Sequence, residues 1–177
     1  MAAVIAEKIG APIYPLIVRK VGHPWQPELG LGAIAPDGVL TLDEEMQKRF
    51  MVTEAAVQKV VEAERKELAR RKALYQLGED DFLIEGRNVI AVDDGMATGV
   101  TARVVGEYLR RKSARWTALA VPVASDQALA QAASCFDRVF CLAHDAAFTA
   151  VSRWYKVFGQ VSDRKIQELI EELRSVR

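Results

Sequence analysis

The chain lacks the residues and runs that mark metal-binding, disulfide-bonded or membrane-spanning proteins. Its 177 residues include only two cysteines and two histidines, and Cys135 and Cys141 lie at neither a metal-ligand nor a C-x-x-C spacing. No apolar run approaches the roughly 20 residues that cross a bilayer. Glu7 and Lys8 interrupt the N-terminal stretch in which a signal peptide needs its apolar core. We therefore expect reduced thiols, no metal held by the protein alone, no membrane partner and a cytoplasmic location.

An excess of charge of one sign is also absent. The 24 basic and 24 acidic residues give a net charge of +0, which argues against a general surface for nucleic acid or membrane. One local basic block stands in a predicted helix, and we interpret it as a solvated helix face rather than a contact for diphosphate or RNA. The block consists of Arg65, Lys66, Arg70, Arg71 and Lys72. We do not expect a nucleic-acid partner.

Two common nucleotide-binding patterns are missing, the Walker A motif and the G-x-G-x-x-G fingerprint. In their place, residues 88–105 read NVIAVDDGMATGVTARVV. Asn88–Val92 is a short apolar run that predicts a buried strand. From Val100 onward, apolar residues return at helical spacing. A strand, a loop of small residues and a helix are the arrangement with which an open parallel sheet places an anion at a helix N-terminus.

The loop between that strand and helix carries the chemistry. Gly95 and Gly99 allow backbone N–H groups to turn inward, and Thr98 and Thr101 add hydroxyl donors, which suits one phosphate monoester. The pair Asp93–Asp94 repels phosphate but suits the cis hydroxyls of a sugar, or a metal beside it. The alternative is an ordinary tight turn, which has no need for two acids and two threonines together.

Elsewhere, strands and helices alternate, which predicts an α/β fold with a mostly parallel sheet. Asp43, Thr53 and Ser125 are predicted N-caps of helices. The predicted elements are helix Ala2–Ile9, buried strand Ile13–Val18, a mobile loop at Val21–Leu31, a hairpin within Ala33–Leu42, a short helix after Asp43, helix Glu54–Leu77, helix Val100–Arg111, strand Thr117–Val121, helix Asp126–Ser134, strand Val139–Leu142 and a final helix from Ser162 or Asp163. Arg19 and Lys20 would then end a strand on the ligand side of the sheet, although solvation of the strand end is an equal alternative.

The central loop resembles the phosphoribosyl diphosphate (PRPP) loop of the type I phosphoribosyltransferases. In that family a hydrophobic strand is followed by two acidic residues and by small residues around T-G-x-T, as in Val89–Thr101. The stretches LIVRKVG, PELGLGAIAPDG, AVPVAS and WYKVFGQVSD extend the resemblance to a group of uncharacterised phosphoribosyltransferase-domain proteins. It implies a Rossmann-like three-layer sandwich with a small hood, in one domain of residues 1–177. Residues 21–77 would be its flexible loop, hairpin and helical insertion.

The resemblance also implies an activity. Such enzymes move a phosphoribosyl group between PRPP, or a nucleoside 5′-monophosphate, and a nitrogenous base, usually with Mg²⁺. Asp93 and Asp94 would be the catalytic pair that meets the ribose hydroxyls, and Arg19 and Lys20 could approach the diphosphate or base. The residues that would hold the 5′-phosphate are Gly95, Met96, Ala97, Thr98, Gly99, Val100 and Thr101. The base remains unidentified.

The sequence departs from the family at its start. Members usually carry a strand and an Arg-Gly-Gly loop for diphosphate before the first helix, and this sequence begins inside that helix. The sheet would then close by pairing Ile13–Val18 with Asn88–Val92, borrow a strand from another chain in a homo-oligomer, or leave a gap. The departure favours an alternative function, a non-catalytic module that senses nucleotide or PRPP.

Other candidate ligand residues carry weaker signals. His144 is a minor candidate for a general base. Phe148, Trp154 and Tyr155 could form a face for a base, but their spacing is more typical of a core.

Overall fold

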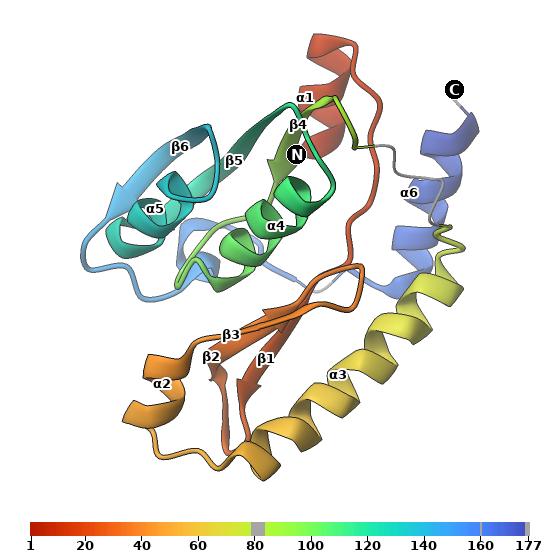
Figure 1. Ribbon diagram of the computed structural model, residues 1–177. Coiled ribbons are helices and arrows are strands. Elements are labelled where there is room, and N and C mark those ends of the chain that lie inside the picture. The colour runs from red at the N-terminus through yellow and green to blue at the C-terminus, as the bar shows by residue number, and fades with distance from the viewer. Residues whose placement is uncertain (79–83, 160, 176–177) are drawn as a thin grey trace.

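Two three-stranded sheets organise the chain (Figure 1). The computed structural model describes residues 1–78, 84–159 and 161–175. The parallel sheet has the order β4-β5-β6, formed by β4 (Asn88–Val92), β5 (Trp116–Ser125) and β6 (Arg138–Asp145). The mixed α/β fold with a parallel sheet is therefore confirmed. Strand β4 has the predicted bounds, whereas β5 and β6 extend further toward their carboxyl ends than their apolar runs indicated.

Helices α4 (Val100–Arg111) and α5 (Asp126–Ala133) cover one face of the parallel sheet. Their buried side chains pack with the sheet residues that alternate toward them, including Leu119 and Val121. On the opposite face, Ile90, Phe140 and Leu142 are exposed, with 89% of Leu142 open to solvent. Helix α4 also packs against the second sheet, so it lies between the two.

The second sheet is antiparallel and packs against the longest helix. It comprises β1 (Arg19–His23), β2 (Gln26–Ile34) and β3 (Leu40–Leu42), in that order, and is followed by α2 (Glu44–Arg49) and α3 (Glu54–Leu74). Val21, Leu31 and Ile34 are fully buried against α3. Burying side chains of this size contributes about 1.5–3 kcal/mol each. The predicted hairpin turn joins β2 to β3, at Pro36-Asp37-Gly38.

The prediction of a mobile loop at Val21–Leu31 is wrong, because most of this stretch forms β1 and β2. Its glycines serve close strand packing. A Cβ on Gly22 would overlap the carbonyl oxygen of Pro27, and one on Gly32 would overlap that of Thr41. Glycine therefore occurs here because the chains approach closely, a use that the sequence alone does not separate from loop flexibility.

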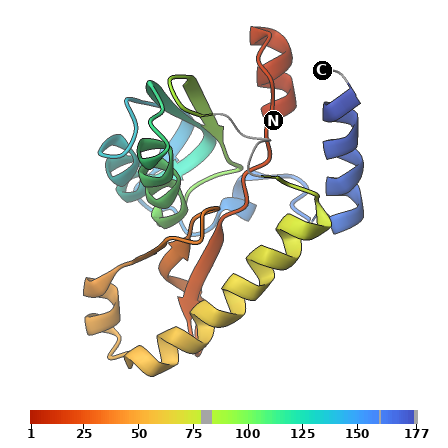
Figure 2. The ribbon, with the colours of Figure 1, turned by 45° about the vertical axis from the view of Figure 1, so that its right-hand side comes forward.

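The predicted strand at Ile13–Val18 is also wrong. Helix α1 (Ala2–Ile9) ends as expected at Gly10, whose φ is 64°, but the chain then runs extended without a sheet partner until β1 begins at Arg19 (Figure 2). A cavity of about 780 Å³ separates this segment from β4 and is lined by residues of both. Ile13–Val18 therefore does not pair with Asn88–Val92 within the chain, and a strand supplied by a second chain stays a prediction. A strand needs a hydrogen-bonding neighbour, and neither segment reaches the other.

The three predicted N-caps are confirmed. The side chains of Asp43, Thr53 and Ser125 accept the N–H groups of Met46, Ala56 and Ala128, respectively. Each satisfies one of the N–H groups that a helix start leaves unpaired.

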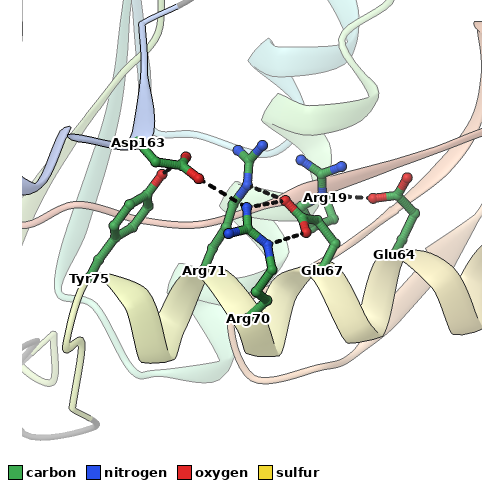
Figure 3. A network of polar contacts seen from close by, with 7 residues as sticks. All are labelled: Arg19, Glu64, Glu67, Arg70, Arg71, Tyr75 and Asp163. Carbon is green, nitrogen blue, oxygen red and sulfur yellow. Dashed lines mark hydrogen bonds and ion pairs between the residues drawn. The ribbon is translucent and has the colours of Figure 1, made fainter. Parts of the chain in front are cut away.

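The first residue of helix α6 (Asp163–Ser175) is hydrogen-bonded to side chains at the end of α3 (Figure 3). The hydroxyl of Tyr75 donates to Asp163 at 2.6 Å, and Arg70 reaches the same carboxylate at 3.0 Å. Hydrogen bonds from Arg70 and Arg71 lower the pKa of Glu67 to about 2. These two members of the basic block are ion-paired on the helix, which supports the interpretation as a solvated face. No helix in the described parts of the chain is long and apolar enough to cross a membrane.

Candidate functional site

The loop between β4 and α4 is built against the carboxyl end of β5. The amide of Asp93 donates to Ala120 O at 3.2 Å, and that of Met96 donates to Val123 O at 3.0 Å. Met96 O in turn accepts the amide of Ser125 at 2.9 Å. Met96 is only 4% exposed, and both of its backbone groups are bonded to β5. Met96 therefore anchors the loop, and its contact with substrate stays a prediction.

Ser125 makes a second anchor. Its hydroxyl accepts Ala128 N at 3.0 Å as the cap of α5, and it donates to Ala97 O at 2.7 Å. One side chain thus fixes the start of α5 and the middle of the loop together. The capping pattern predicted the first bond only, because the second joins residues 28 positions apart.

The loop's two glycines are required by space. Gly99 has a φ of 75°, and a Cβ there would lie 2.9 Å from Gln131 Oε1 and 3.2 Å from Ala128 Cα. A Cβ on Gly95 would lie 2.8 Å from methyl carbons of both Val123 and Val151. The loop is therefore pressed between β5 and α5 on one side and a C-terminal segment on the other.

The turn into α4 presents unpaired backbone donors. The backbone N–H groups of residues 97–101 meet no acceptor among the described residues, and the first amide bonded back to this turn is that of Arg103, which donates to Gly99 O at 2.9 Å. Ala97 and Thr98 are exposed, whereas Val100 is buried and contributes its amide only. Free N–H groups at the positive end of a 12-residue helix attract an anion. Of the predicted phosphate-binding residues, 97–101 present free N–H groups at the start of α4, whereas the amide of Met96 is bonded to β5.

The two carboxylates lie beside this turn. Asp93 Oδ1 accepts the amide of Asp94 at 2.9 Å, and Asp93 also borders the cavity along β4. Desolvation raises the pKa of both groups, and the Asp94 carboxylate raises that of Asp93 further. Among the described residues, no group of three or more His, Cys, Asp or Glu side chains gathers to hold a metal ion. The pair is suited to accepting hydrogen bonds from hydroxyl groups.

The two predicted cations, Arg19 and Lys20, lie on different faces of β1. Side chains alternate along a strand, so Arg19 and Lys20 point to opposite faces of β1. Arg19 faces α3 and donates to Glu64 at 2.6 Å (Figure 3). On the other face, Lys20 Nζ and Val100 Cγ2 both lie within 4.0 Å of the Cβ position of Gly30. The structure therefore brings Lys20, and not Arg19, toward the start of α4.

The segment after β6 returns to the loop. Tyr155 donates its hydroxyl to Asp94 O at 2.6 Å, although 61 positions separate the two residues. Phe148 and Trp154 stack with centroids 6.0 Å apart and planes 14° from parallel. His144 Nδ1 lies 2.7 Å from Asp126 Oδ1. The Tyr155 contact was missed by sequence reasoning, because no local pattern relates residues so far apart.

Comparisons with known proteins identify a family. The family model of the phosphoribosyl transferase domain matches residues 37–155. Two Mycobacterium tuberculosis proteins, provisionally named phosphoribosyl transferases Rv0571c (strain H37Rv) and MT0597 (strain CDC 1551), are each 38% identical over 167 residues. These alignments cover 94% of this chain but only 38% of each relative, so the chain spans little more than a third of their length.

A solved structure has the same fold. The crystal structure of TT1426 from Thermus thermophilus matches with a TM-score of 0.73 and 29% identity. The match covers 96% of this chain and 80% of that one. The family match spans more than half of the chain and includes the whole loop from Asp93 to Thr101, and the chain therefore belongs to the phosphoribosyl transferase domain family.

Proposed function

We propose that the chain binds PRPP or a nucleoside 5′-monophosphate and transfers the phosphoribosyl group to or from a nitrogenous base. One observation carries the proposal. The unpaired N–H groups of residues 97–101 stand directly beside the carboxylates of Asp93 and Asp94. Donors for a phosphate next to acceptors for hydroxyls match the two ends of a 5-phosphorylated ribose.

The roles follow from this chemistry. The amides of residues 97–101 and the hydroxyls of Thr98 and Thr101 hold the 5-phosphate, while Asp93 and Asp94 accept the ribose hydroxyls and orient the ring. Diphosphate leaves C1 as the base nitrogen attacks, and positive charge develops on the ribose ring. The nearby carboxylates favour that charge, so positioning and electrostatics supply most of the rate enhancement.

Mg²⁺ fits this donor set as an ion carried by the substrate. It prefers oxygen ligands, keeps several waters and binds through one or two carboxylates plus phosphates. Asp93 and Asp94 provide such carboxylates, and no third acidic side chain joins them among the described residues. They would hold the ion from the protein side. When bound, the ion would neutralise charge on the diphosphate.

Calorimetry with Mg-PRPP tests the proposal. We expect saturable binding by the wild type and a loss of about a hundredfold in affinity for the double variant Thr98→Ala/Asp94→Ala. The matched control is Glu44→Ala/Ser134→Ala, which removes an exposed carboxylate and an exposed hydroxyl elsewhere. No heat of binding in the wild type, or equal binding by the two double variants, would remove the proposal.

A second candidate is a non-catalytic module that senses PRPP or nucleotide. The observation that favours it is the position of Arg19, whose guanidinium is held by Glu64 on the far face of β1 rather than near the loop. Under this candidate, Mg-PRPP raises the melting temperature but no base causes release of diphosphate. A coupled diphosphate assay with common bases decides between the two, since robust release excludes the sensor.

A further inference from the structure

The segment Val151–Tyr155 clamps the acidic loop from the side opposite β5. Its first four residues form a short 3-10 helix, η1 (Val151–Trp154). Val151 presses its methyl groups against Gly95, and Tyr155 follows with its hydroxyl on Asp94 O. The ring of Tyr155 packs against Phe158, with centroids 5.3 Å apart, and this contact steadies the hydroxyl.

The Tyr155 bond falls on a peptide of the acidic loop that has no hydrogen bond to β5. Before it, Asp93 N is bonded to Ala120 O, and after it, Met96 is bonded to β5 through both backbone groups. The carbonyl of Asp94 has Tyr155 as its partner within the described chain. Gly95 follows, and apart from the Tyr155 bond this peptide is held by the packing of Gly95 between Val123 and Val151. Loss of the Tyr155 bond would free the ψ angle of Asp94, so the orientation of Asp94 beside Asp93 would be held less firmly.

The hydroxyl is suited to hold this bond rather than to move a proton. Burial raises the pKa of Tyr155, and the carboxylates of Asp94 and Asp93 raise it further. The group therefore remains a donor across the neutral range.

We propose that Tyr155 is a positioning residue that holds the Asp94 carbonyl so that the carboxylates of Asp93 and Asp94 face the hydroxyls of a bound ribose. This inference rests on the proposed function, since it assumes that the pair accepts ribose hydroxyls. Under this proposal, the contact between Tyr155 and Asp94, which are 61 positions apart, determines which sugar binds. The amides of residues 97–101 bind the phosphate. Sugar and phosphate recognition are therefore separable by mutation.

The test compares Tyr155→Phe with the wild type by calorimetry, using ribose 5-phosphate, 2-deoxyribose 5-phosphate and inorganic phosphate as probes. We expect Tyr155→Phe to bind ribose 5-phosphate about tenfold more weakly and to bind inorganic phosphate unchanged. The preference for ribose over 2-deoxyribose should fall with it. The matched control is Tyr75→Phe, which removes an equally short bond of 2.6 Å to Asp163 away from the loop and should leave all three affinities unchanged.

Three results would overturn the inference. Tyr155→Phe could bind ribose 5-phosphate as the wild type does, it could lose ribose 5-phosphate and inorganic phosphate equally, or Tyr75→Phe could show the same selective loss. If Tyr155→Phe does not fold, Val151→Ala relaxes the same clamp and should weaken ribose 5-phosphate alone by about threefold; unchanged binding there would contradict the inference. A wild type that binds no ribose 5-phosphate refutes the proposed function itself, an outcome distinct from all of these.

Discussion

Strand β4 meets β5 along one edge and a cavity of about 780 Å³ along the other. On the β5 side, five residue pairs run in continuous parallel register, and the loop that follows keeps bonding to β5 through Asp93 and Met96. On the cavity side, the extended residues Leu16 to Val18 face β4 without a backbone hydrogen bond to another described residue. One edge of β4 is therefore hydrogen-bonded to β5, and the other edge, called the open edge below, borders the cavity.

The difference separates the two halves of the expected ligand site. The groups proposed to bind phosphate and ribose all lie in the loop after β4. This loop contacts β5, α5 and the segment of η1. The family resemblance assigns diphosphate to the side that is open here. We therefore expect sugar and phosphate binding to depend on the chain's own packing, and the open edge to be the least protected part of the parallel sheet.

Amide exchange should show the largest contrast. Asp93 N points to β5, and amides alternate along a strand, so those of Val89 and Ala91 point to β5 while those of Ile90 and Val92 point to the cavity. Hydrogen exchange read by NMR should be about a hundredfold or more faster at Ile90 and Val92. Equal protection of all four would mean that the open edge is filled, and a dependence on protein concentration would then identify a second copy as the partner.

Neutralising Asp93 and Asp94 should weaken sugar binding without unfolding the protein. Asp93→Asn/Asp94→Asn keeps an acceptor for the Asp94 amide and should lower the affinity for ribose 5-phosphate about a hundredfold, as expected for the loss of charged hydrogen bonds. Inorganic phosphate should bind at least as well as before, because two negative charges are gone. Weaker phosphate binding in this variant would show that the loop had been disturbed.

The same variant carries a pH signature. Desolvation raises the pKa of both carboxyl groups in the folded chain, so folding favours their neutral form, but solvent screens this effect because Asp93 is exposed and Asp94 is half-buried. Their stabilising contribution is present below the unfolded pKa of about 4 and is lost as the pH rises through the folded pKa. The Asn variant should therefore melt at a slightly higher temperature than the wild type near neutral pH, and the difference should vanish at about pH 3. A wild type that is the more stable of the two at neutral pH would contradict this.

A side chain at Gly99 should lower the stability of the fold through crowding as well as through backbone strain. Gly99→Ala should lower the free energy of unfolding by about 2–3 kcal/mol, because its Cβ would press on α5 while φ is positive. Gly38 also has a positive φ, 81°, but open space around it, so Gly38→Ala should cost only about 1 kcal/mol. Urea denaturation of the two variants measures the difference, and equal losses would mean that packing of the loop on α5 contributes nothing.

The smallest effects should come from the two neighbouring cations. Arg19→Ala should cost about 1 kcal/mol of stability, since it leaves the half-buried Glu64 without its partner, and should not change the affinity for Mg-PRPP. Lys20→Ala should do the reverse, with a loss in affinity of about fivefold and little change in stability. Calorimetry and urea denaturation on both variants check this, and a loss of affinity in Arg19→Ala would place its guanidinium at the ligand after all.

Local patterns predicted the β5 side of β4 well. The bounds of β4 and α4 match the expected ones, because an apolar run and a helical spacing are each read within a few residues. The caps Asp43, Thr53 and Ser125 match for the same reason. Most of the phosphate loop lies within one such local stretch, so sequence and structure agree there.

What could not be predicted depends on distant partners. Ile13–Val18 has the composition of a strand but no neighbour to pair with, and the glycines of Val21–Leu31 resemble a loop while they serve close strand packing. Misplacing the start of β1 also hid the alternation that sends Arg19 and Lys20 to opposite faces. The contact of Tyr155 with Asp94 joins segments that only the fold brings together.

The most direct test of the account is an amide NMR titration of the wild type with ribose 5-phosphate. The largest shift changes should occur at residues 97–101, from the phosphate, and at Asp93 and Asp94, from the sugar, with little change in β1 to β3. Inorganic phosphate should reproduce the first group of changes and not the second. Shift changes confined to the cavity edge of β4 or to the antiparallel sheet, with residues 97–101 unaffected, would contradict it.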